Sequence, residues 1–170
     1  MRISPALQAF LSLISWSEGT STSRVTQDNG YDVIVSGVDG PHRMTDYDDH
    51  PFASGRPPII VRLSPLLKST ASGRYQLILP TWKAYKSQLQ LLDFGHASQD
   101  AVAAQMIAER DALDQLNSGN VEGAISLCSN LWASFPGNSY GQGGKQIGEL
   151  LEKYQQFEQQ LTSNANSSVS

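Results

Sequence analysis

The sequence predicts an α+β fold in which a small three-stranded antiparallel sheet accompanies a mainly helical part. Short β-branched segments lie between residues 31 and 63, whereas apolar residues recur at helical spacing near the N-terminus and after residue 64. A length of 170 residues fits one domain with a proper hydrophobic core. We expect this domain to span residues 1–161. A disordered, serine-rich tail that has nothing to bury should follow over residues 162–170.

The first predicted helix begins near residue 5, because Ser4 is an N-cap residue and Pro5 suits the first helical position. One face of this helix carries four apolar side chains and a final carboxylate: Leu7, Phe10, Leu11, Ile14 and Glu18. Gly19 is typical of the position just past a helix, so Glu18 should lie on the last turn, at the edge of the buried face. Partial burial and the helix dipole would both raise its pKa, which suits general acid catalysis. The alternative is a solvated carboxylate at a fraying helix end.

Three short strands are expected at residues 31–35, 42–47 and 59–63, with a hairpin turn at 36–40. The segment 48–58 contains three prolines and a glycine, and therefore predicts an irregular loop. Such a loop is either a lid over a site or an ordered surface loop. Helical spacing returns over residues 80–91, 98–110, 121–131 and 145–161, with Ser98 as the expected cap of the second of these helices.

Composition and charge exclude several classes of function. A net charge of −4 leaves no basic surface for phosphates, so nucleic acid is not an expected partner. No segment has the pattern of a membrane span or an export signal, which predicts a cytoplasmic protein. The single cysteine, Cys128, lies in an apolar helical pattern typical of a buried, inert thiol. No metal is expected, because one acidic and histidine-containing cluster matches no zinc or calcium spacing: His42, Asp46, Asp48, Asp49 and His50.

Two further segments are candidates for ligand binding. In the first, Ser72 and Gly73 allow close approach to the backbone, while Tyr75 and Gln76 offer an aromatic face and an amide, groups that commonly hold sugars. Packing of Tyr75 in the core is the alternative. The second segment is the glycine-rich loop over residues 133–144, which carries Tyr140 and follows Trp132.

Six blocks, in this order, resemble the soluble lambda-type phage endolysins, which are lysozyme-like lytic transglycosylases. They are WSEGT (16–20), NGYDVIV (29–35), TDYxDHP (45–51), LxPxLKSTxxGRYQL (63–77), SQDAVAxQxIxER (98–110) and CSNxWASxPGxxYGQ (128–142). The resemblance covers residues 7 to 160. The sequence departs from the pattern in a proline-rich stretch over 51–58 and in its serine-rich tail.

The resemblance implies a two-lobed, lysozyme-like fold that cleaves the β-1,4 bond between N-acetylmuramic acid and N-acetylglucosamine in peptidoglycan without a cofactor. It places the catalytic acid at Glu18. It points to Gln76, with Tyr75 beside it, and to Tyr140 as substrate-binding residues. Ser72 and Trp132, from the same two segments, are further predicted substrate-binding residues. The expected protein is a monomer that waits in the host cytoplasm until a holin-type pore, with which it forms no stable complex, gives access to the periplasmic cell wall.

The residues themselves leave other functions open. Asp28, Asp32 and Asp46 follow Glu18 closely, and one of them could serve a hydrolytic muramidase as its second carboxylate. Turn chemistry is the alternative for Asp32 and Asp46. A non-catalytic glycan-binding module and an intracellular regulatory domain are further alternatives, so the choice of a transglycosylase depends on the resemblance.

Overall fold

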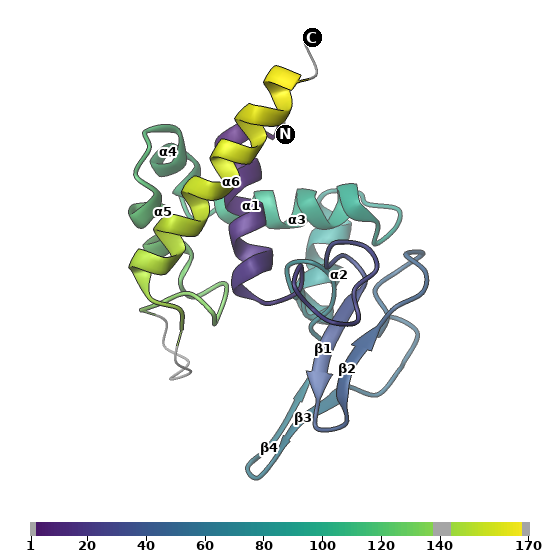
Figure 1. Ribbon diagram of the computed structural model, residues 1–170. Coiled ribbons are helices and arrows are strands. Elements are labelled where there is room, and N and C mark those ends of the chain that lie inside the picture. The colour runs from purple at the N-terminus through teal and green to yellow at the C-terminus, as the bar shows by residue number, and fades with distance from the viewer. Residues whose placement is uncertain (1–2, 138–143, 168–170) are drawn as a thin grey trace. The chain divides into compact units, whose positions relative to one another are not determined.

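The computed structural model describes residues 3–137 and 144–167, and the chain divides into two compact units. Unit 1 comprises Met1–Glu18 and Ala103–Ser170, and unit 2 comprises Gly19–Val102. Six helices and four strands occur within the described ranges (Figure 1), which confirms the predicted α+β class. No helix in these ranges has the length and hydropathy needed to cross a bilayer.

Unit 1 is built on α1 (Pro5–Ser17), which lies beside the long helix α6 (Ile147–Ser167) (Figure 1). The predicted cap is confirmed, because the Ser4 hydroxyl accepts a hydrogen bond from the Leu7 amide at 3.2 Å. Phe10 and Ile14 of α1 are fully buried, as expected for the apolar face. The helix ends before Gly19, whose φ of +77° is easily adopted only by glycine.

Three helices in unit 1 differ from the prediction. The short helix α4 (Ala112–Asn117) was not expected, and α5 (Val121–Cys128) ends before residue 131. The expected end of the last helix at residue 161 is wrong, because α6 continues to Ser167. Hydroxyl groups in this polar extension donate to carbonyls four residues earlier, as from Ser163 to Gln159 at 2.9 Å. Adding residues to an existing helix costs far less than nucleating one, so a polar sequence can still extend it.

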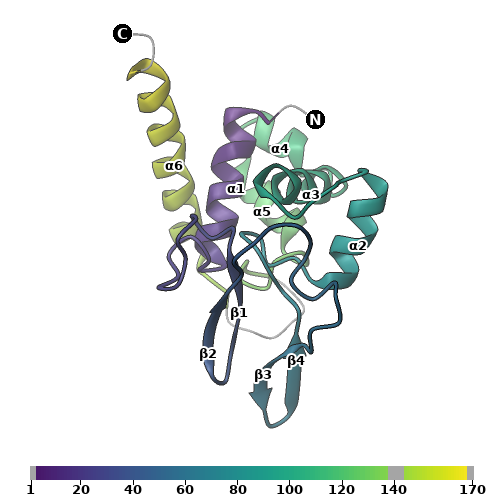
Figure 2. The same ribbon diagram turned by 90° about the vertical axis from the view of Figure 1, so that its right-hand side faces the viewer.

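Unit 2 contains two two-stranded sheets, so the predicted three-stranded sheet is wrong (Figure 2). The strand β1 (Val33–Gly37) pairs with β2 (Gly40–Arg43), and β3 (Ile59–Leu63) pairs with β4 (Leu66–Ser69), both antiparallel. The amide of Val38, in the first hairpin turn, donates to the carbonyl of Ile60 at 2.9 Å and links the hairpins. The strand β4 was not predicted. Both of its leucines are exposed, so its sequence lacks the alternation of buried and exposed residues that indicates a strand.

Two helices follow the hairpins in the chain. The helix α2 (Leu79–Gln88) is shorter than predicted, and α3 (His96–Ala108) begins before the expected cap. The Ser98 hydroxyl instead donates to Asp93 at 3.1 Å, and the Gly95 amide donates to the same oxygen at 2.8 Å. The prediction of Ser98 as the cap is therefore wrong, because Ser98 lies within the first turn of α3 and its hydroxyl binds Asp93.

The proline-rich loop over residues 48–58 is anchored to the core of unit 2. Asp49 accepts hydrogen bonds from the Trp82 indole and the Lys86 ammonium, both at 2.7 Å. The His50 imidazole contacts the Leu77 carbonyl at 2.9 Å and packs against Phe94, with ring centroids 4.9 Å apart. These contacts assign the acidic and histidine side chains at the start of the loop a structural role. Among the described residues, no group of three His, Cys, Asp or Glu side chains could hold a metal.

Candidate active site

Glu18 lies immediately after the last helical residue of α1 and is half-buried. Burial raises the pKa of its carboxyl group above the ordinary value of 4.5. The Ser134 hydroxyl donates to Oε1 at 2.5 Å, and a second hydrogen bond comes from the Ser134 backbone. Both bonds favour the carboxylate, but burial has the larger effect. The predicted direction of the pKa change is confirmed, and Glu18 is not a freely solvated carboxylate at a frayed end.

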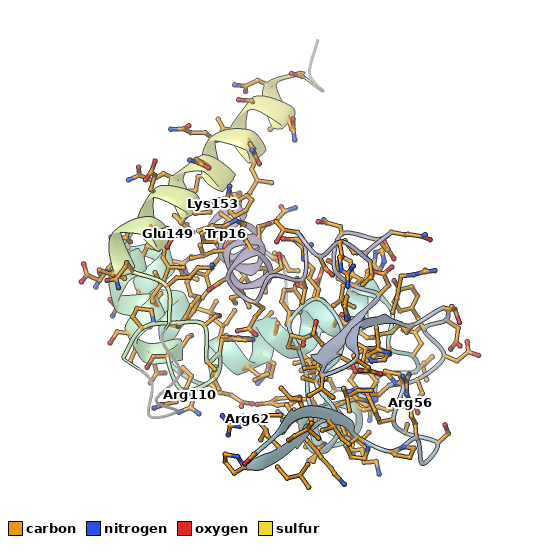
Figure 3. The ribbon with its side chains drawn as sticks, turned by 60° about the horizontal axis from the view of Figure 1, so that its bottom comes forward. Trp16, Arg56, Arg62, Arg110, Glu149 and Lys153 are labelled. Carbon is orange, nitrogen blue, oxygen red and sulfur yellow. The ribbon has the colours of Figure 1, made fainter. Side chains whose placement is uncertain are left out.

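Trp16, two residues before Glu18, joins the end of α1 to the start of α6. The Lys145 ammonium lies 4.6 Å from the centroid of its indole ring, and the Lys153 ammonium lies 5.4 Å away. Figure 3 shows Lys153 of α6 beside Trp16. These cation–π contacts hold the polypeptide that follows the glycine-rich loop against the helix that carries Glu18.

The structure gives Trp132 a packing role, which contradicts its prediction as a substrate contact. Its side chain is 3% exposed, and its ring lies 6.1 Å from that of Phe135. Phe135 packs in turn against Phe10 of α1 at 5.9 Å. Trp132 therefore belongs to the core of unit 1. Tyr140, the other candidate in this segment, lies outside the described residues.

In unit 2, Ser72 and Leu77 pair through two backbone hydrogen bonds of 3.0 and 2.9 Å, which close a tight turn over residues 72–77. A Cβ atom at Gly73 would lie 2.2 Å from the side-chain oxygen of Gln99, so only glycine fits there. Ser72 is fully buried, and its hydroxyl donates to the Thr70 carbonyl at 3.0 Å. The prediction that Ser72 contacts substrate is therefore wrong.

Tyr75 is also a core residue, so its prediction as a sugar contact is wrong and the alternative of core packing is correct. Its side chain is 1% exposed, and its hydroxyl donates to Asp100 Oδ1 at 2.6 Å. The Tyr31 hydroxyl donates to the same oxygen at 2.8 Å. Burial, followed by the charge of Asp100, raises the pKa of Tyr75. Sequence alone does not distinguish an exposed aromatic face from a buried ring with a satisfied hydroxyl.

Gln76 is the member of this turn whose side chain still offers an acceptor. Its backbone has a φ of +51°, a region that is costly for residues other than glycine. The side-chain nitrogen donates to the Gly73 carbonyl at 3.0 Å and to the Val33 carbonyl at 3.4 Å. Oε1 has no partner among the residues that the structure describes. The amide can therefore accept a hydrogen bond from a ligand, and substrate binding by Gln76 remains a prediction.

Thr20 is a structurally important residue that sequence reasoning missed. It is 2% exposed, and its hydroxyl donates to the Arg74 carbonyl at 2.6 Å. A Cβ atom at Gly30 would lie 2.8 Å from the Thr20 carbonyl carbon, which explains the glycine at that position. These contacts fix the chain just after Glu18 to the 72–77 turn within unit 2.

The three aspartates considered as second carboxylates all make structural hydrogen bonds. Asp32 is 3% exposed and accepts from the Thr26 hydroxyl at 2.5 Å and the Gln27 amide at 2.9 Å. Asp28 accepts from the Tyr47 hydroxyl at 2.5 Å. Asp46 accepts from the amide two residues later at 3.2 Å, as in a turn. The turn and hairpin roles predicted as alternatives for Asp32 and Asp46 are confirmed.

Comparison with known proteins agrees with this geometry. The endolysin family model matches residues 8–161. The endolysin of Escherichia phage P2 is 49% identical over 146 residues, which cover 85% of this chain and 88% of that protein. The endolysin of Escherichia phage lambda is 47% identical over 150 residues, which cover 88% and 89%. A solved structure of bacteriophage lambda lysozyme complexed with a chitohexasaccharide matches with a TM-score of 0.82 at 46% identity, covering 92% of this chain and 96% of that one. The chain therefore belongs to the endolysin family and is a phage lysozyme-like enzyme.

Proposed function

We propose that this chain is a lytic transglycosylase that cleaves the β-1,4 bond between N-acetylmuramic acid and N-acetylglucosamine in peptidoglycan during host cell lysis. The observation that carries the proposal is Glu18, a half-buried carboxyl group whose pKa is raised by burial. The chitohexasaccharide bound in the lambda lysozyme structure supports a β-1,4-linked glycan as the substrate. Both units would then act as one lysozyme-like catalytic domain over residues 1–161, which requires no metal or cofactor.

The chemistry needs one carboxyl group in two protonation states. Protonated Glu18 donates its proton to the glycosidic oxygen as the bond from that oxygen to C1 of the muramoyl residue breaks. The Glu18 carboxylate then takes the proton of the muramoyl C6 hydroxyl, and the oxygen of that hydroxyl forms a bond to C1. The product is a 1,6-anhydromuramoyl end, the catalytic carboxyl group is protonated again, and no water is consumed. Because the nucleophile belongs to the substrate, its effective concentration is high.

A hydrolytic muramidase would need a second carboxylate to act as nucleophile or to activate water. The structural bonds of Asp28, Asp32 and Asp46 leave these side chains poorly suited to that role. A glycan-binding module without turnover would have no use for a shielded acid. Both considerations favour the transglycosylase.

Digestion of purified peptidoglycan tests the proposal. Mass spectrometry of the released fragments should find 1,6-anhydromuramoyl ends, and the Glu18→Gln variant should bind the glycan without cleaving it. Reducing ends alone would show a hydrolytic muramidase. Binding without any cleavage by the unaltered chain would show a glycan-binding module.

Delivery to the cell wall is a separate part of the proposal. We propose that the enzyme acts as a monomer, remains in the host cytoplasm and reaches the periplasmic wall when a holin-type pore opens. Expression of the chain alone should then leave cells intact until the inner membrane is breached, for example by chloroform. Lysis without membrane damage would contradict this route.

A further inference from the structure

The two sides of the glycine-rich loop meet at its base in direct backbone contact. The Lys145 amide donates to the Ser134 carbonyl at 2.9 Å. A Cβ atom at Gly144 would lie 2.8 Å from the Phe135 carbonyl oxygen and 3.0 Å from that of Ser134. No side chain fits in this space, so a glycine is required where the chain returns from the loop.

Each side of this base is also attached to α1. Phe135 is fully buried and packs against Phe10, with ring centroids 5.9 Å apart. On the other side, the Lys145 ammonium lies 4.6 Å from the ring centroid of Trp16. The pair of segments 134–135 and 144–145 therefore has a fixed position relative to the end of α1.

Glu18 lies at the C-cap, and its amide still donates to the Ile14 carbonyl at 2.8 Å, so the helix fixes its backbone while its carboxyl group needs support of this kind from elsewhere. Ser134 provides that support through its hydroxyl, 2.5 Å from Oε1, and through a backbone hydrogen bond. Its own carbonyl is held by Lys145. The carboxyl group is thereby connected to a rigid base by one residue that bonds it twice.

We infer that Ser134 is a positioning residue, which orients the Glu18 carboxyl group toward the glycosidic bond. This inference rests on the proposed function, because it requires Glu18 to be the catalytic acid. Ser134 also affects protonation, since its hydrogen bonds lower a pKa that burial raises. A group that must first donate a proton and then accept one benefits from such opposing influences.

The variants Ser134→Ala and Ser134→Thr test this inference, with Ser126→Ala as a matched control on the exposed side of α5. Loss of the hydroxyl should lower kcat by about 10- to 100-fold, as expected for one hydrogen bond to a charged group, with little change in KM. Ser134→Thr keeps the hydroxyl and should recover most of the activity. In a carbon-13 NMR titration without substrate, Ser134→Ala should move the pKa of Glu18 upward, because a bond that stabilised the carboxylate is gone.

Three outcomes would overturn the inference. One is a normal kcat with an unchanged pKa in Ser134→Ala. Another is a loss of activity without any change in the pKa, or without recovery in Ser134→Thr, which would indicate a purely structural role. Full turnover by Glu18→Gln would overturn both this inference and the proposed function. The transglycosylase proposal and the role of Ser134 are tested separately when all cleaved bonds are counted, whatever ends they leave. A chain that releases only reducing ends disproves the transglycosylase. The Ser134 variants would still show whether Ser134 positions Glu18.

Discussion

The two compact units treat their buried and half-buried carboxyl groups in opposite ways. In unit 1, burial raises the pKa of Glu18, and among the residues that the structure describes its side-chain hydrogen bonds come from Ser134. In unit 2, Asp28 accepts from the Tyr47 hydroxyl at 2.5 Å and contacts His96 Nε2 at 2.6 Å, and its pKa is lowered, chiefly by the Tyr47 bond. A carboxyl group that is shielded from water and accepts few hydrogen bonds holds its proton and can act as an acid. A carboxylate that accepts bonds from several donors stays ionised and stabilises the structure around it.

Asp100 extends the comparison, because it holds two tyrosine hydroxyls in unit 2 without having been predicted as important. Tyr31 and Tyr75 both donate to its Oδ1 atom, at 2.8 and 2.6 Å. Arg74 lies 5.1 Å from the centroid of the Tyr31 ring and completes the cluster. Asp100 thus stabilises the turn that carries the GRYQ segment through the hydroxyl of Tyr75.

The largest expected effect is the loss of turnover in Glu18→Gln. We expect a decrease of roughly 10²- to 10⁴-fold, the usual contribution of a general acid, with the fold intact. Asp28→Asn is the matched control, and its turnover should stay within a few-fold of the unaltered enzyme. Rates of peptidoglycan cleavage measure both. An equal loss in Asp28→Asn would break the distinction between catalytic and structural carboxyl groups.

Asp100→Ala should have the largest effect on stability. It removes the acceptor of two tyrosine hydroxyls, one of them on a fully buried ring, and leaves these donors unsatisfied. The free energy of unfolding should fall by about 2–4 kcal/mol, measured by urea denaturation. Tyr75→Phe, which removes only one donor, should cost less. A loss below about 0.5 kcal/mol in Asp100→Ala, the range of an ordinary surface change, would disprove the anchoring role.

Local patterns predicted the α1 helix and its carboxylate well. The Ser4 cap, the apolar face and Gly19 all act within a few residues of one another, so their spacing determines the structure. The partner of Glu18 could not be predicted in the same way. Ser134 is 116 residues away in the sequence, and nothing in its immediate neighbours indicates what its hydroxyl contacts.

The errors in unit 2 arise where pairing or packing contacts, and not the residue pattern of the segment itself, determine the structure. The aromatic side chain of Tyr75 suggested a sugar contact, but Asp100 satisfies its hydroxyl inside the core. The strand β4 was missed because pairing with β3, rather than an alternating pattern, holds its exposed leucines in an extended conformation. In both cases the deciding contact joins residues whose local sequence gives no sign of it.

The pH dependence of stability should differ in sign between the two kinds of carboxyl group. Glu18 has a raised pKa in the folded state, so its favourable contribution is present below the unfolded value of 4.5 and is lost as the pH rises through the folded pKa. At a pH above the folded pKa of Glu18, the Glu18→Gln variant should therefore be more stable than the unaltered chain. Asp28 has a lowered pKa, so its contribution is present above 3.8 and is lost as the pH falls through the folded pKa.

Unfolding curves collected between pH 3 and 8 test these signs, and Asp28→Asn provides the opposite case. The Asp28 effect should be the smaller one, because solvent screens a carboxylate that is 37% exposed. A stability difference for Glu18→Gln that does not change with pH would mean that burial does not alter the protonation of Glu18.

The smallest expected effect concerns Ser17, which also neighbours Glu18 but contrasts with Ser134. Its side chain is 7% exposed, and its hydroxyl is buried with no hydrogen-bond partner among the described residues. Ser17→Ala should leave turnover unchanged and stabilise the fold by a few tenths of a kcal/mol to about 1 kcal/mol, because it removes an unsatisfied group. Ser15→Ala is the matched control, since the Ser15 hydroxyl donates to the Ser12 carbonyl at 3.0 Å, and its removal should destabilise the fold. A rise in KM for Ser17→Ala would instead assign this hydroxyl to the glycan, and the support of Glu18 by Ser134 alone would then be an incomplete description of the site.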